Sequence, residues 1–420
     1  MPIAIDINDS PIVRGIKTVG IGKKGSQELE RSLVEEIFRD LRENLVDPVQ
    51  KGAFFAALIQ KGVTAEESIL KNAFAPGVFD DPHLLAKTLS PDAPPFIQWI
   101  CGQILSGHTL DVATAQQVGE FLFSQEPGDG ARGLIASYLR VRYETNEEYE
   151  GLLKAIEDTL EPSFKEPVPA GRPIIQLAEP FDGVTRSYFI TPLIAEFIQR
   201  HNYRVISLVG RSSGPKMGNT LLDIAKAING QFAQRNQDLE KLTPDFGWFI
   251  DQKDLSKPLD RWVDIRRKTI KRPFLATLER FVNPCKARIV IASAFHPPYT
   301  EKMVTVCEGA GFPGAIVMRN GQEGTLSFPL NRSVKVLCSA RQKDGSYIRQ
   351  EFEFSPAHIL EHEIGQDEKL AVPTLKDNAQ LIFKYKGQRK SGNIMFDDRV
   401  KVTTLALGEA LAWVERNIIN

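Results

Sequence analysis

The chain has 420 residues, of which 42% are hydrophobic and 25% charged, with 52 Lys and Arg against 53 Asp and Glu. This composition is typical of a globular chain and excludes collagen-like, largely disordered and strongly polyelectrolyte proteins. No apolar run reaches the roughly 18 residues of a membrane span, and the N-terminus lacks the pattern of a secretory signal. The four cysteines form no CxxC pair. We therefore expect a cytoplasmic protein that does not contact a membrane.

The segment 1–165 is predicted to be helical. Apolar residues recur at spacings of three and four between Leu29 and Leu45, which indicates one helix, and a second helix follows over 52–62. Segment 52–67 resembles the later segment 133–148: both have a glycine-led apolar helix, a basic end and a Thr-x-Glu-Glu sequence. Thr64 and Thr145 are predicted to be helix N-caps. Either the helical unit is duplicated or a common pattern recurs by chance.

From about residue 170, short β-rich runs alternate with helical stretches, which predicts a mostly parallel sheet with helices on its faces. The expected strands are 173–177, 203–209, 247–250, 287–294, 314–318 and 334–339. The expected helices between them are 191–200, 219–228 and 300–309. A polar, hairpin-like region over 340–356 precedes a final helix over 400–418, and a proline-rich linker at 163–173 separates the two halves.

A loop between a strand ending at Val209 and a helix starting near Asn219 is the strongest local candidate for a site. Glycines allow close backbone approach, and N–H groups, hydroxyls and a helix N-terminus favour an anion. The loop contains Gly210, Arg211, Ser212, Ser213, Gly214 and Lys216. The pattern predicts a phosphate site, although its spacing is neither that of a Walker loop nor that of a Rossmann fingerprint. The alternative is an ordinary strand-to-helix turn.

A second candidate is the basic segment 261–288, in which nine Lys and Arg against two acidic residues give a net charge of +7. Such a segment is typical of proteins that bind anionic ligands or a nucleic-acid backbone. The alternative is a solvated helix face. A third candidate is His296, which follows an expected strand; ligands collect at the carboxyl ends of parallel strands, although a lone histidine can also be structural.

The order of these features resembles the anthranilate phosphoribosyltransferase family, which belongs to glycosyltransferase family 3 together with the pyrimidine nucleoside phosphorylases. The resemblance runs from about residue 104 to the end of the chain, through segments 105–123, 130–156, 179–198, 266–284, 293–324 and 377–416. The closer likeness is to a divergent branch of that family, which carries Thr-Pro (191–192), His-Pro-x-Tyr (296–299) and Gly-x-Glu-Gly (321–324).

The resemblance implies an α/β fold class: a small N-terminal all-helical domain and a large α/β domain with a mostly parallel central sheet. It divides the chain into a helical extension, 1–90, which is a candidate duplicate of the helical unit; a family helical domain, 91–165; and an α/β domain, 170–420. It also implies phosphoribosyl pyrophosphate in a cleft, Mg2+ where that donor site functions and no cofactor otherwise, and a homodimer through the helical domain.

The family's donor loop is only partly retained. Asp182 and Gly183 keep the end of the glycine-rich loop, but 178–181 now read Ala-Glu-Pro-Phe. Proline removes one N–H donor, phenylalanine obstructs the backbone, and the glutamate would repel an anion unless a metal intervened. Thr191 and Gly210 match single family positions, and Lys216 lies near the position of a lost lysine. The candidate donor-binding residues are Asp182, Gly183, Thr191, Gly210, Arg211, Ser212, Ser213 and Lys216.

The other site residues follow from the same comparison. Gln322 replaces one residue of the family's acidic metal pair, which leaves Glu323 as the candidate magnesium ligand, and Arg266 stands where the family's anthranilate-contacting arginine lies. The candidate residues for an acceptor or a polyanion are Arg266, Arg267, Lys268, Lys271, Arg272 and His296. No catalytic residue is identified.

The function implied by the resemblance is a pentosyl or phosphoribosyl transferase with a degenerate phosphoribosyl pyrophosphate loop and an unknown acceptor. The loss of three binding elements disfavours anthranilate itself as that acceptor. The alternative is a non-catalytic homodimer that binds nucleic acid or another polyanion through 261–288, because members of the divergent branch are associated with nucleic-acid binding.

Overall fold

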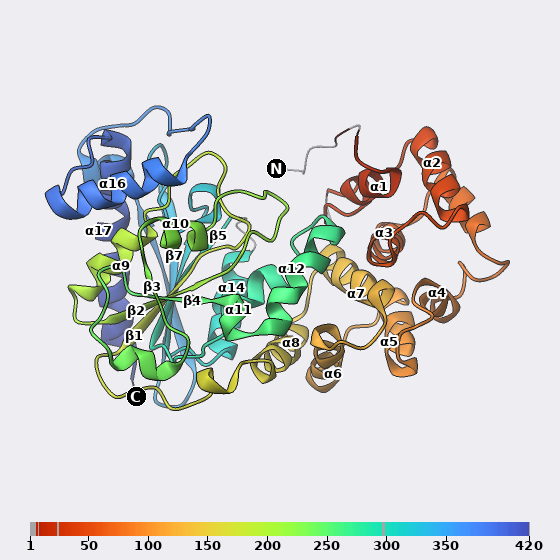
Figure 1. Cartoon of the computed structure of the whole chain (residues 1–420), viewed down its shortest axis with the longest axis horizontal. Helices are drawn as coiled ribbons and strands as arrows, with labels where there is room; N and C mark the ends of the chain where they lie inside the picture. Colours follow the sequence, from red (N-terminus) through yellow and green to blue (C-terminus); the bar gives the residue numbers. More distant parts are fainter. Residues whose placement is uncertain (1–5, 7, 23–24, 296–298, 420) are drawn as a thin grey trace. The chain divides into compact units, whose positions relative to one another are not determined.

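The structure is a computed structural model, and it describes residues 6, 8–22, 25–295 and 299–419. It forms two compact units: a helical unit of Met1–Asp158 with Arg261–Ala276, and an α/β unit of Thr159–Asp260 with Thr277–Asn420. The predicted fold class, helices followed by an α/β unit with a mostly parallel sheet, is confirmed (Figure 1). The segment 261–276, which the sequence places in the α/β domain, packs with the helical unit.

The helical unit consists of consecutive short helices, several of which begin at a capping aspartate. Asp47, Asp81 and Asp111 accept backbone N–H groups at the starts of α3, α4 and α6. The elements are α1 (Pro11–Val19), α2 (Arg31–Arg42), α3 (Pro48–Lys61), η1 (Glu67–Ala73), α4 (Pro82–Leu89), α5 (Pro95–Leu105), α6 (Val112–Phe123), α7 (Asp129–Arg142) and α8 (Asn146–Asp158). The helix α12 (Lys257–Thr269) joins this unit from residue 261 onward.

The sequence repeat is present in the bounds of the helices. The offset that carries segment 52–67 onto segment 133–148 also carries both ends of α2 onto those of α6, and both ends of α3 onto those of α7. The buried carboxylates of Glu67 and Glu148 are related by this repeat offset and have equivalent partners. Glu67 accepts from Leu29 N at 3.0 Å, Thr64 N at 2.9 Å and Lys61 Nζ at 2.8 Å.

Glu148 accepts from Leu110 N at 3.1 Å and Thr145 N at 2.9 Å, and it pairs with Arg142. Each partner of Glu148 is therefore related to the corresponding partner of Glu67 by the repeat offset. A chance recurrence of sequence does not require equal hydrogen-bond partners, so these contacts support a duplicated helical unit.

Helices α3 and α7 pack closely through glycines that the repeat offset also relates. A Cβ atom on Gly52 would lie 2.0 Å from the carbonyl oxygen of Gly130, and one on Gly133 would lie 2.0 Å from that of Val49. Positions 49 and 130 are related by the same offset. The two halves of this contact are thus equivalent, as in an interface with two-fold symmetry.

The α/β unit is built on one eight-stranded sheet in the order β3-β4-β2-β1-β5-β6-β7-β8. The strands are β1 (Ile174–Ala178), β2 (Arg204–Val209), β3 (Gln231–Phe232), β4 (Trp248–Asp251), β5 (Ile289–Ala294), β6 (Gly314–Arg319), β7 (Val334–Arg341) and β8 (Tyr347–Phe354). The first six in this order pair in parallel, whereas β7 and β8 are antiparallel. The strand expected over 334–339 corresponds to β7, and the hairpin-like region predicted over 340–356 contains β8, which pairs with β7.

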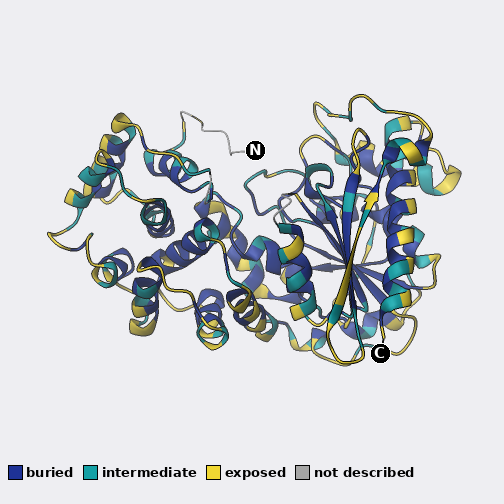
Figure 2. Cartoon of the chain, turned by 180° about the vertical axis from the view of Figure 1, so that it is seen from behind, coloured by how far each residue is buried: buried dark blue, intermediate teal, exposed yellow. Residues whose placement is uncertain are grey.

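Helices cover both faces of the sheet (Figures 1 and 2). One face packs on α9 (Thr191–Gln199), α10 (Leu221–Ala227), α16 (Leu375–Gln388) and α17 (Ile394–Asn417), through side chains such as Ile175, Ile291 and Met318. The helix α14 (Tyr299–Gly309) packs on β5, β6 and β7. Smaller elements are η2 (Pro162–Phe164), η3 (Asn236–Glu240), α11 (Gln252–Leu255), α13 (Leu275–Leu278), η4 (Gln322–Gly324) and α15 (Pro356–Leu360). Within the described ranges, no helix combines the length and the apolar character that a bilayer span requires.

Candidate anion-binding site

Three loops meet at the carboxyl edge of the sheet: 179–190 after β1, 210–220 after β2 and 320–333 after β6. The strand order reverses beside β1, because β2, β4 and β3 lie on one side of it, and β5 and β6 lie on the other. In open parallel sheets, ligands bind outside the carboxyl ends of the strands at such a reversal. The predicted donor-binding residues all lie in the loops after β1 and β2, apart from Thr191, which begins α9.

The loops after β1 and β2 are joined by backbone hydrogen bonds. Val184 N donates to Asn219 O at 2.8 Å, and Asn219 N donates to Val184 O at 3.0 Å. Gly183 has a φ of 75°, and a Cβ atom there would lie 2.6 Å from the carbonyl oxygen of Gly218. Position 183 therefore needs glycine for both its left-handed backbone and its close approach. The two loops form one frame.

Glu323, from the loop after β6, places its carboxylate on this frame. Its Oε2 accepts from Thr185 N, and its Oε1 accepts from Arg186 N, each at 2.7 Å. Lys216 Nζ donates to the carbonyl oxygen of Glu323 at 2.8 Å and to that of Gly183 at 3.3 Å, and it lies 3.5 Å from Glu323 Oε2. Two successive N–H groups and an ammonium group thus hold both oxygens of one anion, as in known anion-binding turns.

Three predicted site residues, Gly183, Lys216 and Glu323, are therefore brought together by the tertiary structure. The N–H groups of Thr185 and Arg186 were not predicted, because a main-chain donor has no signature in residue type. The sequence feature that could have indicated Thr185 and Arg186 is their position directly after Asp182, Gly183 and Val184.

Thr191 lies against Glu179. Its Oγ1 donates to the Glu179 carboxylate at 2.5 Å, and Leu326 N donates to the same group at 3.0 Å. Glu179 is fully buried, and burial raises the pKa of this carboxyl to about 7, against the lowering effect of its hydrogen bonds and of Arg280. The carboxylate that the sequence suggested would repel a bound anion is thus hydrogen-bonded to Thr191 and Leu326.

The remaining predicted donor residues have other surroundings. Arg211 donates from Nε to Asp260 Oδ1 at 2.9 Å and from its terminal nitrogen to the Asp260 carbonyl at 2.7 Å. Asp182, Gly210 and Ser213 are buried, and Ser212 is partly exposed. A Cβ atom on Gly210 would lie 2.8 Å from the ring of Phe181, so phenylalanine does fill the space beside this glycine.

The basic residues of 261–276 lie in the helical unit, and only some of their side chains are exposed. Arg266 and Lys271 are buried, at 2% and 7% exposure. Lys268 pairs with Asp47 at 2.7 Å, Arg267 pairs with Asp264 at 3.6 Å, and Arg272 is half-buried. The predicted residues thus do not form one continuous exposed face within the described part of the chain. His296 lies outside the described residues.

Magnesium has no preformed carboxylate cage among the residues that the structure describes, because no three His, Cys, Asp or Glu side chains come together there. The Glu323 carboxylate is held by Thr185 and Arg186, and the Gln322 amide donates to the Glu368 carbonyl at 3.3 Å. This donor set does not fit a magnesium ion held by the protein alone. Coordination of magnesium by Glu323 stays a prediction.

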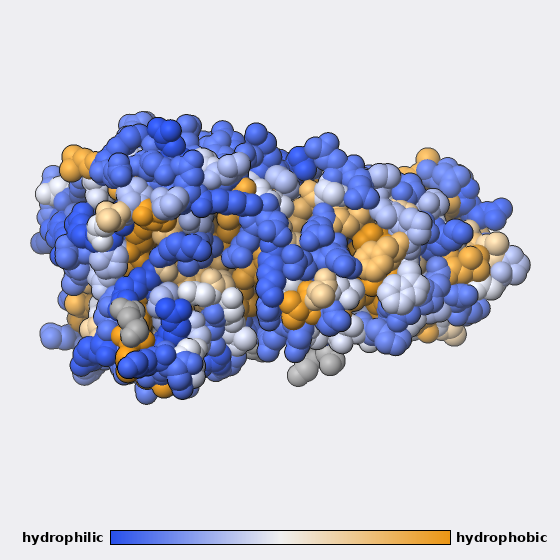
Figure 3. All heavy atoms as spheres, turned by 90° about the horizontal axis from the view of Figure 1, so that it is seen from below, coloured by the Kyte–Doolittle hydropathy of each residue, from blue (hydrophilic) through white to orange (hydrophobic). Residues whose placement is uncertain are grey.

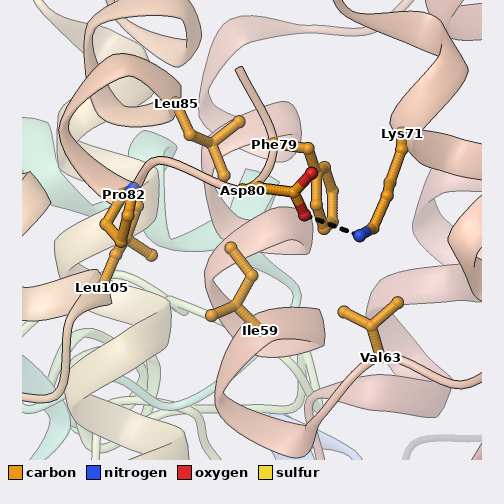
Figure 4. A pocket seen from close by; sticks show the side chains of 8 residues that line it. All are labelled: Ile59, Val63, Lys71, Phe79, Asp80, Pro82, Leu85 and Leu105. Carbon is orange, nitrogen blue, oxygen red and sulfur yellow. Dashed lines mark hydrogen bonds and ion pairs between the residues drawn. The ribbon is translucent and has the colours of Figure 1, made fainter. Parts of the chain in front are cut away.

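A separate cavity of about 280 Å³ lies in the helical unit, lined by Ile59, Val63, Lys71, Phe79, Asp80, Pro82, Leu85 and Leu105 (Figure 4). Its walls are mainly apolar, and its two charged residues pair with each other, with Lys71 Nζ 2.6 Å from Asp80 Oδ1. Because the lysine is neutralised by this partner, the cavity does not offer the convergent donors that a phosphate needs. None of the predicted site residues lines it.

Comparison with curated sequences finds a relative whose own function is not described. No family model matches the chain. An uncharacterized protein of Aquifex aeolicus (strain VF5) is 25% identical over 192 residues, which are 46% of this chain and 56% of that protein. The match thus spans little more than half the length of that curated relative.

Two solved structures illustrate what the chain is similar to. The anthranilate phosphoribosyltransferase of Thermus thermophilus has a TM-score of 0.49 at 15% identity, over 75% of this chain and 97% of that one. The anthranilate phosphoribosyltransferase of Saccharomyces cerevisiae, in complex with phosphoribosyl pyrophosphate and Mg, has a TM-score of 0.46 at 10% identity. The match covers 93% of this chain and 98% of that one. Both TM-scores lie below 0.5, so the chemistry of this chain is argued from its own residues.

Proposed function

We propose that the α/β unit binds a phosphorylated ligand through the N–H groups of Thr185 and Arg186 and the ammonium group of Lys216. The observation that carries this proposal is that these donors already hold both oxygens of a carboxylate at the carboxyl edge of the sheet. Phosphate oxygens are acceptors for the same main-chain and lysine donors.

The reaction we propose is a pentosyl or phosphoribosyl transfer to an acceptor other than anthranilate. In such a transfer, catalysis depends on positioning the anionic leaving group while positive charge develops on the sugar. Phosphoribosyl pyrophosphate, the donor that the resemblance in sequence implies, is therefore the first to test. Here magnesium would enter with the phosphate oxygens of the ligand, because the described residues supply no carboxylate cluster.

Calorimetric titration with phosphoribosyl pyrophosphate and Mg2+ at low salt tests this function. We expect saturable binding at micromolar strength, about −8 kcal/mol, and a loss of roughly 10- to 100-fold in Lys216→Ala, because a charged hydrogen bond is removed. Lys226→Ala is the matched control, since Lys226 is an exposed lysine on α10. No heat from the wild-type chain up to millimolar ligand would exclude this donor.

A homodimer through the helical unit is the second part of the proposal. Leu84 on α4, and Phe96 and Trp99 on α5, are 42%, 43% and 53% exposed, and the two aromatic rings stack at 6.4 Å. Helices α4 and α5 pack against each other, and apolar side chains gather over the helical part of the face in Figure 3. Exposed aromatic residues on neighbouring helices are typical of an interface core.

Sedimentation equilibrium tests the dimer. The wild-type chain is expected to have twice its mass of 46.9 kDa, and Trp99→Ser is expected to shift it to the monomer, because the aromatic contact area is lost. Leu242→Ser is the control, since Leu242 is 94% exposed in the α/β unit. A monomeric wild-type chain at high concentration would contradict the dimer.

The alternative function, binding of nucleic acid or another polyanion through 261–288, has less support. Arg266 and Lys271 are buried, and Lys268 is paired with Asp47. Nucleic-acid binding would be recognised by an affinity that falls steeply with salt.

A cytoplasmic location is also proposed, and it fits the four cysteines, which are buried and free of disulfides.

A further inference from the structure

We propose that the Glu323 carboxylate is an internal occupant of the anion site, and that a phosphorylated ligand binds only by displacing it. This inference rests on the proposed function, because the ligand and the carboxylate compete for the same donors. Glu323 would thus regulate the site and not hold its metal ion.

The competition follows from the contacts. Each carboxylate oxygen of Glu323 has an N–H donor of its own at 2.7 Å, from Thr185 and from Arg186. A phosphate group that took these two N–H groups would occupy the position of the carboxylate. The two anions cannot share it, because of both overlap and like-charge repulsion. The carboxylate also lies near Lys216 Nζ, at 3.5 Å from Oε2, and so partly neutralises the cation that would attract the ligand.

The carboxylate can leave without dismantling the frame that holds it. The loops after β1 and β2 are joined by the two hydrogen bonds between Val184 and Asn219, and neither involves Glu323. Glu323 belongs to the separate loop after β6, and its side chain is 17% exposed. Its φ of 53° is unfavourable for a residue other than glycine, so the contacts of its carboxylate help to keep it in this conformation.

Self-occupancy and a magnesium role predict opposite effects of removing the charge. If Glu323 held magnesium, its neutralisation would weaken binding, and only where magnesium is present. If Glu323 is the internal occupant, its neutralisation strengthens binding with or without magnesium, because the competitor is lost.

The test is calorimetric titration of the full chain with inorganic pyrophosphate, with and without Mg2+. Glu323→Gln is expected to bind at least about tenfold more tightly than wild type under both conditions. Glu361→Gln is the matched control and is expected to bind as wild type does. Glu361 is an exposed glutamate of the same unit with a φ of 64°, so its replacement changes the net charge equally.

Each outcome decides between the hypotheses. Binding by Glu323→Gln that is equal to wild type overturns the inference and leaves the proposed function standing; binding that weakens only with Mg2+ overturns it in favour of a metal ligand. If no variant binds, both the inference and the proposed function fail.

Should Glu323→Gln not fold, Glu323→Asp replaces it. The shorter side chain reaches the N–H groups less well, so tighter binding than wild type is again expected. Amide signals of Thr185 and Arg186 must shift on addition of pyrophosphate, and shifts confined to other residues would overturn the site.

Discussion

Gly133→Ala is expected to lower the free energy of unfolding of the helical unit by about 3 kcal/mol. The added Cβ atom would lie 2.0 Å from the carbonyl oxygen of Val49, and main-chain atoms of a helix cannot move aside as a flexible side chain can. Helices α3 and α7 would have to separate, which exposes buried side chains on both. Gly52→Ala should have a similar effect, because its Cβ atom would lie 2.0 Å from the carbonyl oxygen of Gly130.

Urea unfolding followed by circular dichroism measures this change. The control is Gly387→Ala, at a helical position on α16 where, apart from the neighbouring backbone of the same helix, no atom lies within 4 Å of the added Cβ. That variant should be about 0.5–1 kcal/mol more stable than wild type, because alanine loses less backbone entropy in a helix. A Gly133→Ala variant whose free energy of unfolding is equal to or higher than that of wild type would contradict the close α3–α7 contact.

Glu179→Gln is expected to remove a pH dependence of stability of roughly 3 kcal/mol. Burial raises the pKa of Glu179 from 4.5 to about 7 in the folded chain. The folded state therefore holds this proton more tightly than the unfolded state does. The stabilising contribution is fully present below pH 4.5 and is lost as the pH rises through 7, where the buried carboxyl has to ionise.

The stability difference between Glu179→Gln and wild type, measured by urea unfolding from pH 4.5 to 8, isolates this group from the others that titrate. The difference should grow in favour of the variant up to about pH 7 and stay constant above it, because the glutamine amide does not ionise and its oxygen can still accept from Leu326 N. Glu363→Gln, at an exposed glutamate, is the control for the loss of one carboxyl group. A difference for Glu179→Gln that does not change with pH would mean that this carboxyl titrates normally in the folded state.

The secondary structure could be predicted because its signals are local. The strand predicted over 203–209 differs from β2 (Arg204–Val209) by one residue at its start, and Thr191–Pro192 marks the start of α9. The duplication is also readable from residue types, since Thr64 and Thr145 precede equivalent glutamates. What the sequence does not show is that these glutamates also bind the backbone of Leu29 and Leu110, which lie far earlier in the chain.

Residue types also misplace side chains where burial depends on packing between distant segments. The basic segment 261–276 has the composition of an exposed, anion-binding face, yet it packs into the helical unit and buries Arg266 and Lys271. Trp262, which lies among these basic residues, is buried as well and donates its indole N–H to the carbonyl of Leu122. Charge counting cannot detect this, because aliphatic stems of long basic side chains are readily buried.

The fold class, the repeat and the loops in which an anion site could form can be predicted from residue types, since each depends on periodicity, spacing or glycine. Which groups meet in those loops depends on contacts between segments that lie far apart in the chain. Glu323 reaches the N–H groups of Thr185 and Arg186 across 138 and 137 residues of chain, and main-chain donors are the same at every position except proline. The proposed anion site depends on the parallel order of β1, β2 and β6, which brings the ends of these strands to one edge of the sheet.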